Sequence, residues 1–317
     1  MREVSQTRLC AFAKGTYSNL RTQFRCYLNF CTYFKRNPLP ADLQTICGFA
    51  QFLSRSIKPP SIRNYLSGVK LLHIFMGHEY RFGQSFHLQL TMRGIERIHQ
   101  YVPRRAIPIT IQTLLAVQRL SQSFSSLERA VLACGLLLFF TLARAGSILP
   151  SSTRTPSSQF LTSSRVNLAK EGLLVTLIHT KNIQFGKRRL HIPLLYTDSP
   201  ICPVKAYLAS QSVHHSVQST PAFVYVDSGI TRWLTKSIFI DTFRSLLQLA
   251  NIPDARSYTG HSFRRGGASW AFQSGIPGEL IQIIGDWSSD AYKRYFEFTM
   301  DNKINLAALL VQGLPPN

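Results

Sequence analysis

The segment GHSFRRGGA (residues 260–268) decides the fold, together with GDW (285–287) and DAYKRY (290–295) further along the chain. His261 and Arg264 are three residues apart, so on a helix they share one face, with Cβ atoms about 5–6 Å apart. A histidine that donates a hydrogen bond and an arginine whose guanidinium donates two parallel hydrogen bonds can hold two oxygens of one phosphate. The segment therefore predicts a phosphate site, although a solvated helix end has the same pattern.

Two tyrosines follow the tryptophan of this region. Tyr295 lies eight residues after Trp287, and Tyr292 lies one turn earlier. A phenol has a pKa near 10 and is a poor nucleophile unless cations stabilise its anion. His261 and Arg264 can provide that stabilisation for either tyrosine. An aromatic side chain packed in the core is the alternative for both.

Two cations far upstream are further candidates. Arg144 follows a largely apolar run, residues 130–143, and Lys181 lies where the first strand of a predicted hairpin ends. A charge at the end of a buried helix needs a partner, or it compensates the helix dipole. A lysine on a turn can act as a proton donor, but many such lysines are simply solvated.

The chain is strongly basic. It has 36 Lys and Arg against 15 Asp and Glu, a formal charge of +21. Residues 1–108 hold 16 basic and 4 acidic residues, and residues 109–317 hold 20 and 11. Because the excess is spread over both halves, it predicts a protein that surrounds a polyanion such as nucleic acid. Ribosomal and membrane-surface proteins share this feature.

The cysteines and the apolar run exclude other classes. The six cysteines form no CxxC motif and have no histidine pair at zinc-finger spacing, which predicts reduced thiols in an intracellular protein without a structural metal. No signal peptide is evident. The run 130–143 is shorter than the roughly 20 residues of a membrane span, so it predicts a buried core helix.

Length and periodicity predict two domains of a mainly α protein with a small antiparallel sheet. Residues 1–101 form a helical domain, with Ser61 capping its third helix, and 102–109 form a linker rich in proline and arginine. Residues 110–317 are mostly helical. The helices are expected at 18–34, 42–53, 62–76, 85–99, 111–121, 125–143, 203–210, 237–250, 265–274, 278–284, 290–298 and 302–311, and the hairpin strands at 173–179 and 189–193.

The order of these features resembles the tyrosine recombinase, or phage integrase, family over nearly the whole chain. Three segments are most similar to eukaryotic mobile-element recombinases of the DIRS-like and crypton-like kinds. They are TKNIQFGKRRLHIPL (180–194), GHSFRRGGAS (260–269) and GDWSSDAYKRYFEF (285–298). The resemblance implies a SAM-like core-binding domain at 1–101 and a catalytic domain at 110–317. It also implies a nuclear location.

The resemblance implies a role for each candidate. The catalytic set is Arg144, Lys181, His261, Arg264, Trp287 and Tyr295, with Tyr295 as the nucleophile and Tyr292 as the alternative. Two features depart from the family pattern. Ser147 stands where many members carry an acid, and the gap from Trp287 to Tyr295 is eight residues, where about nine is usual.

The implied reaction is DNA strand transfer through a 3′-phosphotyrosine, without metal or nucleotide cofactor. Four protomers would assemble on two double-stranded DNA sites, and the helix at 302–311 would dock on a neighbour or on its own domain. Alternatives are a catalytically decayed DNA-binding protein and, ranked third, a type IB topoisomerase, which usually has a larger clamp. The expected DNA contacts are Lys58, Ser61, Arg63, Asn64, Arg104, Arg105 and Arg265.

Overall fold

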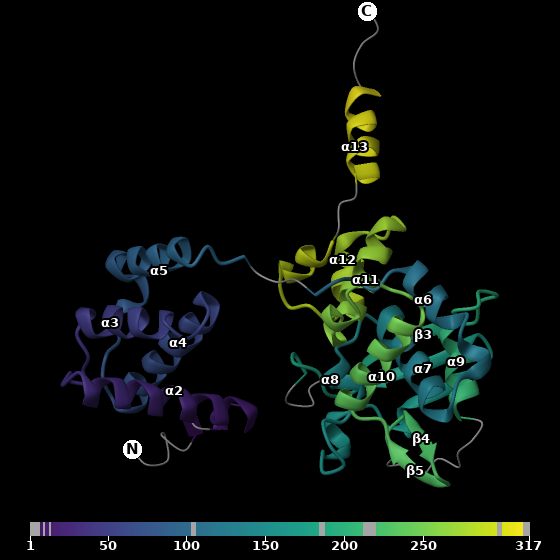
Figure 1. Ribbon diagram of the computed structural model, residues 1–317, viewed down its shortest axis with the longest axis horizontal. Helices are drawn as coiled ribbons and strands as arrows, with labels where there is room; N and C mark the ends of the chain where they lie inside the picture. The colour runs from purple at the N-terminus through teal and green to yellow at the C-terminus, as the bar shows by residue number, and fades with distance from the viewer. Residues whose placement is uncertain are drawn as a thin grey trace, which may run out of the picture. The chain divides into compact units, whose positions relative to one another are not determined.

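The computed structural model describes residues 7–8, 10–12, 14–102, 106–183, 188–211, 220–296 and 300–312. The chain divides into two compact units, residues 1–104 and 105–317 (Figure 1). The division falls inside the linker predicted at 102–109. Arg104 and Arg105, the DNA contacts expected in that linker, lie outside the described residues.

The N-terminal unit is helical in its described part. It contains α2 (Lys14–Tyr33), α3 (Leu43–Ser54), α4 (Pro59–Phe75), η1 (Phe82–Gln84) and α5 (Phe86–Ile98). Its core forms where apolar residues at helical spacing meet, and Tyr27, Phe49 and Ile62 are fully buried in it. Buried His73 accepts a hydrogen bond from the Ala41 backbone amide through Nε2, at 3.1 Å, which joins α4 to the chain before α3.

Helix α4 begins earlier than the sequence predicts. Lys58 occupies the N-cap position, and Pro59 and Pro60 form the first turn. Proline suits this place, because its φ is already helical and the amide it lacks would have no partner there. The prediction that Ser61 caps the helix is therefore wrong, and Ser61 is half-buried within the first turn. Lys58, Arg63 and Asn64 are exposed.

The C-terminal unit is built around α7 (Ser126–Phe140), whose residues 130–139 are all buried. A capping box of Ser125 and Glu128 starts this helix. The helices α6 (Ile111–Gln118), α9 (Pro203–Gln211), α10 (Lys236–Leu249) and α11 (Gly260–Gln273) contact it (Figure 1). The apolar run is thus a core helix, as predicted.

Two small antiparallel sheets complete the unit. The first has the order β1 (Val166–Ala169), β2 (Gly172–Leu177), β3 (Leu190–Leu195), and Val175 faces Ile192 in its register. The second pairs β4 (Val224–Asp227) with β5 (Ile230–Trp233). The mainly α class is confirmed, but the expectation of a single sheet is wrong. β1, β4 and β5 have four residues each, too few for a clear alternation of apolar and polar residues.

Segments near the ends of α7 and α11 differ from prediction. Helix α7 ends at Phe140, so Arg144 does not end it and instead occupies the N-cap position of α8 (Ala145–Ile148). Helix α11 begins at Gly260, where Thr259 caps it, so His261 lies on its first turn. Added Cβ atoms at Gly266 and Gly267 would overlap the carbonyl oxygens of Ile109 and Phe139, which explains the glycine pair.

The remaining segments follow α11. They are α12 (Gly278–Ile284), η6 (Asp290–Tyr295) and α13 (Met300–Gln312), and the short 3₁₀ turns elsewhere are η2 (Ser121–Ser123), η3 (Ser157–Gln159), η4 (Ser163–Arg165) and η5 (Ala255–Ser257). The sequence predicts an α-helix at 290–298, whereas the described part is a 3₁₀ helix that ends at Tyr295.

Candidate active site

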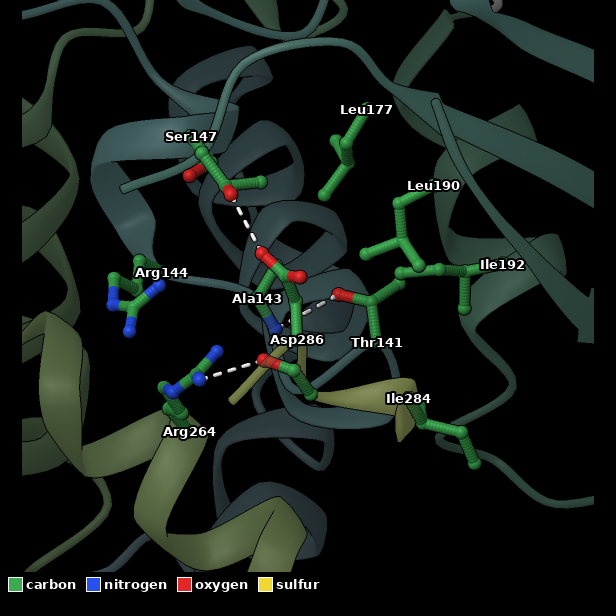
Figure 2. A pocket seen from close by; sticks show the side chains of 12 residues that line it. Thr141, Ala143, Arg144, Ser147, Leu177, Leu190, Ile192, Arg264, Ile284 and Asp286 are labelled. Carbon is green, nitrogen blue, oxygen red and sulfur yellow. Dashed lines mark hydrogen bonds between the residues drawn. The ribbon is translucent and has the colours of Figure 1, made fainter. Parts of the chain in front are cut away.

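A polar pocket lies where the end of α7, α8, the β2–β3 hairpin and the α12 end meet (Figure 2). Arg144, Ser147, Arg264 and Asp286 line it, together with apolar side chains from the hairpin. Figure 2 shows Asp286 in the middle of the pocket, with Arg144 and Arg264 along one side. The pocket therefore brings together residues that are more than 140 positions apart in the chain.

Arg264 is the most deeply buried charged group of this site, with 1% of its surface exposed. Its Nη1 donates to the carbonyl oxygen of Leu142, and its Nη2 donates to that of Gly285 at 2.6 Å. The indole of Trp287 covers the guanidinium, with Cζ 3.7 Å from the ring centroid. Two carbonyls and an aromatic face thus compensate the desolvation of a buried cation.

Charges around Arg264 act in opposite directions on its pKa. Burial lowers this pKa most, and the positive charge of Arg144 lowers it further. The side chains of Tyr295 and Asp286 raise it, and the Tyr295 ring lies beside the Trp287 indole that covers the guanidinium. Nε is buried and has no hydrogen-bond partner among the described residues. Tyr295 therefore lies near a cation whose Nε donor has no bond in the described part of the chain.

His261 stands in a positive environment. The residue is exposed overall, but the protein around its ring lowers its pKa most, and Arg264, Arg144 and Lys181 lower it further through their charges. At neutral pH the imidazole is therefore mainly uncharged. The same interactions place Arg144, Lys181 and Arg264 within electrostatic range of His261.

The two candidate tyrosines have different surroundings. Tyr295 is half-buried, its ring centroid is 5.5 Å from that of Trp287, and its backbone oxygen accepts a 2.5 Å hydrogen bond from Ser269. Tyr292 is 3% exposed and packs among Trp287, Phe296 and Gly278. Tyr292 thus belongs to the core, whereas Tyr295 lies beside Arg264.

The hairpin turn that carries Lys181 is bonded to the segment before Trp287. Lys181 is exposed, and its neighbours Thr180 and Asn182 both donate hydrogen bonds to Asp286. Asp286 is not among the residues predicted from the sequence. The sequence feature that could have indicated Asp286 is its place directly before Trp287, in a chain that has few acidic residues.

Three predicted residues have contacts that bear on their expected roles. Ser147 is 5% exposed and lines the pocket, with its amide donating to the Arg144 oxygen at 2.8 Å. Arg63 forms an exposed ion pair with Glu96 at 2.7 Å. Arg265 is 8% exposed and its Nη1 donates to the oxygen of Ala106 at 3.2 Å, so a surface contact with DNA does not fit it. We correct its role to holding the start of the C-terminal unit.

Comparison with known proteins gives structural likeness without sequence likeness. No protein-family model matches the chain, and no curated protein does. The Tn1549 transposon integrase in complex with circular intermediate DNA has a TM-score of 0.63 and 12% identity, over 97% of this chain and 98% of that one.

Two further solved structures are similar. The XerH site-specific recombinase bound to palindromic difH substrate has a TM-score of 0.61 and 13% identity, over 93% of this chain and 79% of that one. A lambda integrase dimer bound to a COC′ core site has a TM-score of 0.55 and 14% identity, over 93% of each chain. At these identities the likeness shows a shared fold along nearly the whole chain.

Proposed function

We propose that this chain, which has the tyrosine-recombinase fold, is a site-specific DNA recombinase or integrase that cleaves and rejoins DNA through a 3′-phosphotyrosine. One observation carries the proposal: the ring of Tyr295 lies 5.5 Å from the Trp287 indole, which covers the buried guanidinium of Arg264, and the charges of Arg144 and His261 act in the same place. The charge of +21 and the DNA-bound state of the similar structures support a DNA substrate.

The proposed reaction is a balanced transfer. Tyr295 Oη forms a bond to the phosphorus while the bond from phosphorus to the 5′ oxygen breaks. The uncharged imidazole of His261 takes the phenol proton, and Lys181 donates a proton to the departing 5′ oxygen. Arg144 and Arg264 stabilise the added charge on the non-bridging oxygens. A 5′-hydroxyl from a second duplex then reverses the step, so no external energy source is needed.

The second candidate function is a DNA-binding protein whose catalytic site has decayed. Ser147 favours it, because an uncharged residue lines the pocket where the resemblance implies an acid. The two functions differ in one product, a covalent protein–DNA adduct. A duplex nicked beside the cleavage position tests this, because the short released strand diffuses away and traps the adduct. A pool of such duplexes with randomised sequence removes the need to know the target.

DNA binding is expected to be coupled to proton uptake at His261. The pKa of His261 is lowered in the free protein, and a phosphate in the site offsets the cations that lower it. The bound protein therefore holds more protons, so affinity should rise as pH falls through and below the ordinary histidine pKa of about 6.5. The gain is up to about tenfold for each pKa unit that DNA restores.

Fluorescence anisotropy of a labelled duplex at several pH values measures this effect. The His261→Gln variant is the control, since it keeps the other eight histidines. Its Kd should depend less steeply on pH than that of the wild type. Equal slopes for the two proteins would rule out His261 as the linked group.

Assembly of four protomers through α13 is part of the proposal. The described side chains Met300, Ile304 and Val311 are apolar and exposed, which suits docking on a neighbouring copy.

No helix in the described part of the chain is long and apolar enough to cross a membrane. A nuclear location belongs to the proposal as well, and it rests on the resemblance to eukaryotic mobile-element recombinases.

Removing residues 300–317 should leave binding to one site intact and prevent assembly on paired sites, because the expected DNA contacts lie in other segments. Mass photometry with one-site and two-site duplexes measures the two properties. Ile304→Ser is the matched point variant, and it should weaken assembly in the same direction. Unchanged assembly of the truncated protein would show that α13 does not dock in trans.

A further inference from the structure

Asp286 connects two parts of the candidate active site that are far apart in the sequence. It is 5% exposed, and its φ of +54° places it in the left-handed region. One carboxylate oxygen, Oδ2, accepts a 2.6 Å hydrogen bond from Thr180 Oγ1, and the other forms an ion pair with Arg188. The backbone oxygen of Asp286 accepts from Asn182 Nδ2. Three residues around the Lys181 turn are therefore bonded to one residue.

The neighbours of Asp286 connect it to the other half of the site. The oxygen of Gly285 accepts from Arg264 Nη2, and Trp287 covers the Arg264 guanidinium. A displacement of residues 285–287 would therefore move both the Lys181 turn and the guanidinium of Arg264. The backbone path is short, since Gly285, Asp286 and Trp287 are consecutive.

Asp286 also provides a negative charge to the lining of the pocket. Among the described residues that line the pocket, Asp286 is the acidic one, and its charge raises the pKa of Arg264. Ser147, which lines the same pocket, carries no charge. The pair with Arg188 contributes little alone, because the Arg188 side chain is 57% exposed. The buried bond from Thr180 to the carboxylate is the stronger restraint.

We infer that Asp286 is a positioning residue, which holds the Lys181 turn against the Arg264–Trp287 segment so that Lys181 reaches the departing 5′ oxygen. The inference rests on the proposed function. Asp286 touches neither substrate nor reacting atom in this account and acts through Thr180 and Asn182. Its effect should therefore appear in the proton-donation step.

The Asp286→Asn variant isolates the carboxylate. Asparagine tolerates the left-handed backbone, so the turn at residue 286 is retained. Thr180→Val removes one partner of the carboxylate and leaves Asp286 in place. Asp290→Asn is the matched control, because Asp290 lies on the same segment with an exposed side chain paired to Lys293.

The deciding measurement compares two nicked duplexes. One has the ordinary 5′ oxygen at the cleaved bond, and the other has sulfur there, a leaving group that needs no proton. With oxygen, Asp286→Asn and Thr180→Val should form adduct about 10-fold to 100-fold more slowly, part of the 10²–10⁴ that a placed proton donor contributes. With sulfur, both variants should approach the wild-type rate. Asp290→Asn should match the wild type on both substrates.

Two outcomes would overturn the inference. Equal slowing on oxygen and sulfur would mean that Asp286 only supports the structure, and unchanged rates on oxygen would mean that it positions nothing. Amide hydrogen exchange of residues 177–183 without DNA gives an independent readout. Faster exchange in Asp286→Asn supports the connection, and unchanged exchange contradicts it. Absence of adduct from wild-type protein would instead count against the proposed function, which this exchange measurement does not require.

Discussion

Replacing Tyr295 by Phe is expected to abolish the covalent protein–DNA adduct, with a loss of about 10⁵-fold or more, the scale of removing a nucleophile. The Tyr295 phenol lies near the Arg264 guanidinium, and phenylalanine keeps the ring against Trp287 but removes the attacking oxygen. The fold should be unaffected. Denaturing gels of protein incubated with nicked duplex measure the adduct directly.

Tyr292→Phe is the matched control for this prediction. Tyr292 is buried between Trp287, Phe296 and Gly278, so its loss of a hydroxyl should leave adduct formation within about threefold, because the ring and its packing are retained. An adduct that persists in Tyr295→Phe and disappears in Tyr292→Phe would reverse the assignment of the nucleophile. It would also require η6 to rearrange when DNA binds.

Arg264→Lys is expected to have the second largest effect, on both activity and stability. Lysine keeps the charge but cannot donate to Leu142 and Gly285 while lying flat against Trp287. Adduct formation should fall about 10²-fold to 10³-fold, as when one donor to a developing oxyanion is removed. Two buried carbonyls lose a partner, so the free energy of unfolding should fall by about 2–4 kcal/mol.

Arg265→Lys separates the two effects. Arg265 is a buried neighbour on the same helix, and its described bond runs to Ala106, away from the Leu142–Gly285 pair. Its replacement should lower the melting temperature but leave adduct formation much less affected than Arg264→Lys does. Thermal unfolding and adduct rates of both variants give the comparison. Equal loss of activity in the two variants would show that Arg264 acts through stability alone.

Periodicity predicted most of the helices, because helical spacing is a local property of the chain, whereas the roles of the candidate catalytic residues stay a prediction. Residues 130–140 of the apolar run belong to the core helix α7, and the β2–β3 hairpin forms where strand-forming residues gather. Boundaries were less accurate. Pro59 starts α4 where a serine cap was expected, and Leu142, with φ of +53°, lies between α7 and Arg144.

Contacts between distant segments could not be predicted from the sequence. Thr180 and Asp286 are 106 residues apart, and no pattern in either segment indicates that they meet. Arg265 shows the same limit, since two adjacent arginines look equally available until the fold buries both. Its role depends on Ala106, 159 residues earlier, which a helical-face argument does not include.

Incubation of the wild-type protein with the randomised pool of nicked duplexes tests the central claim most directly. We predict a protein–DNA adduct that survives denaturation, with the 3′-phosphate mapped to Tyr295 by mass spectrometry. Sequencing the trapped strands would then define the target. Tight binding to the pool without any adduct would contradict a strand transferase and favour a protein that binds DNA without cleaving it.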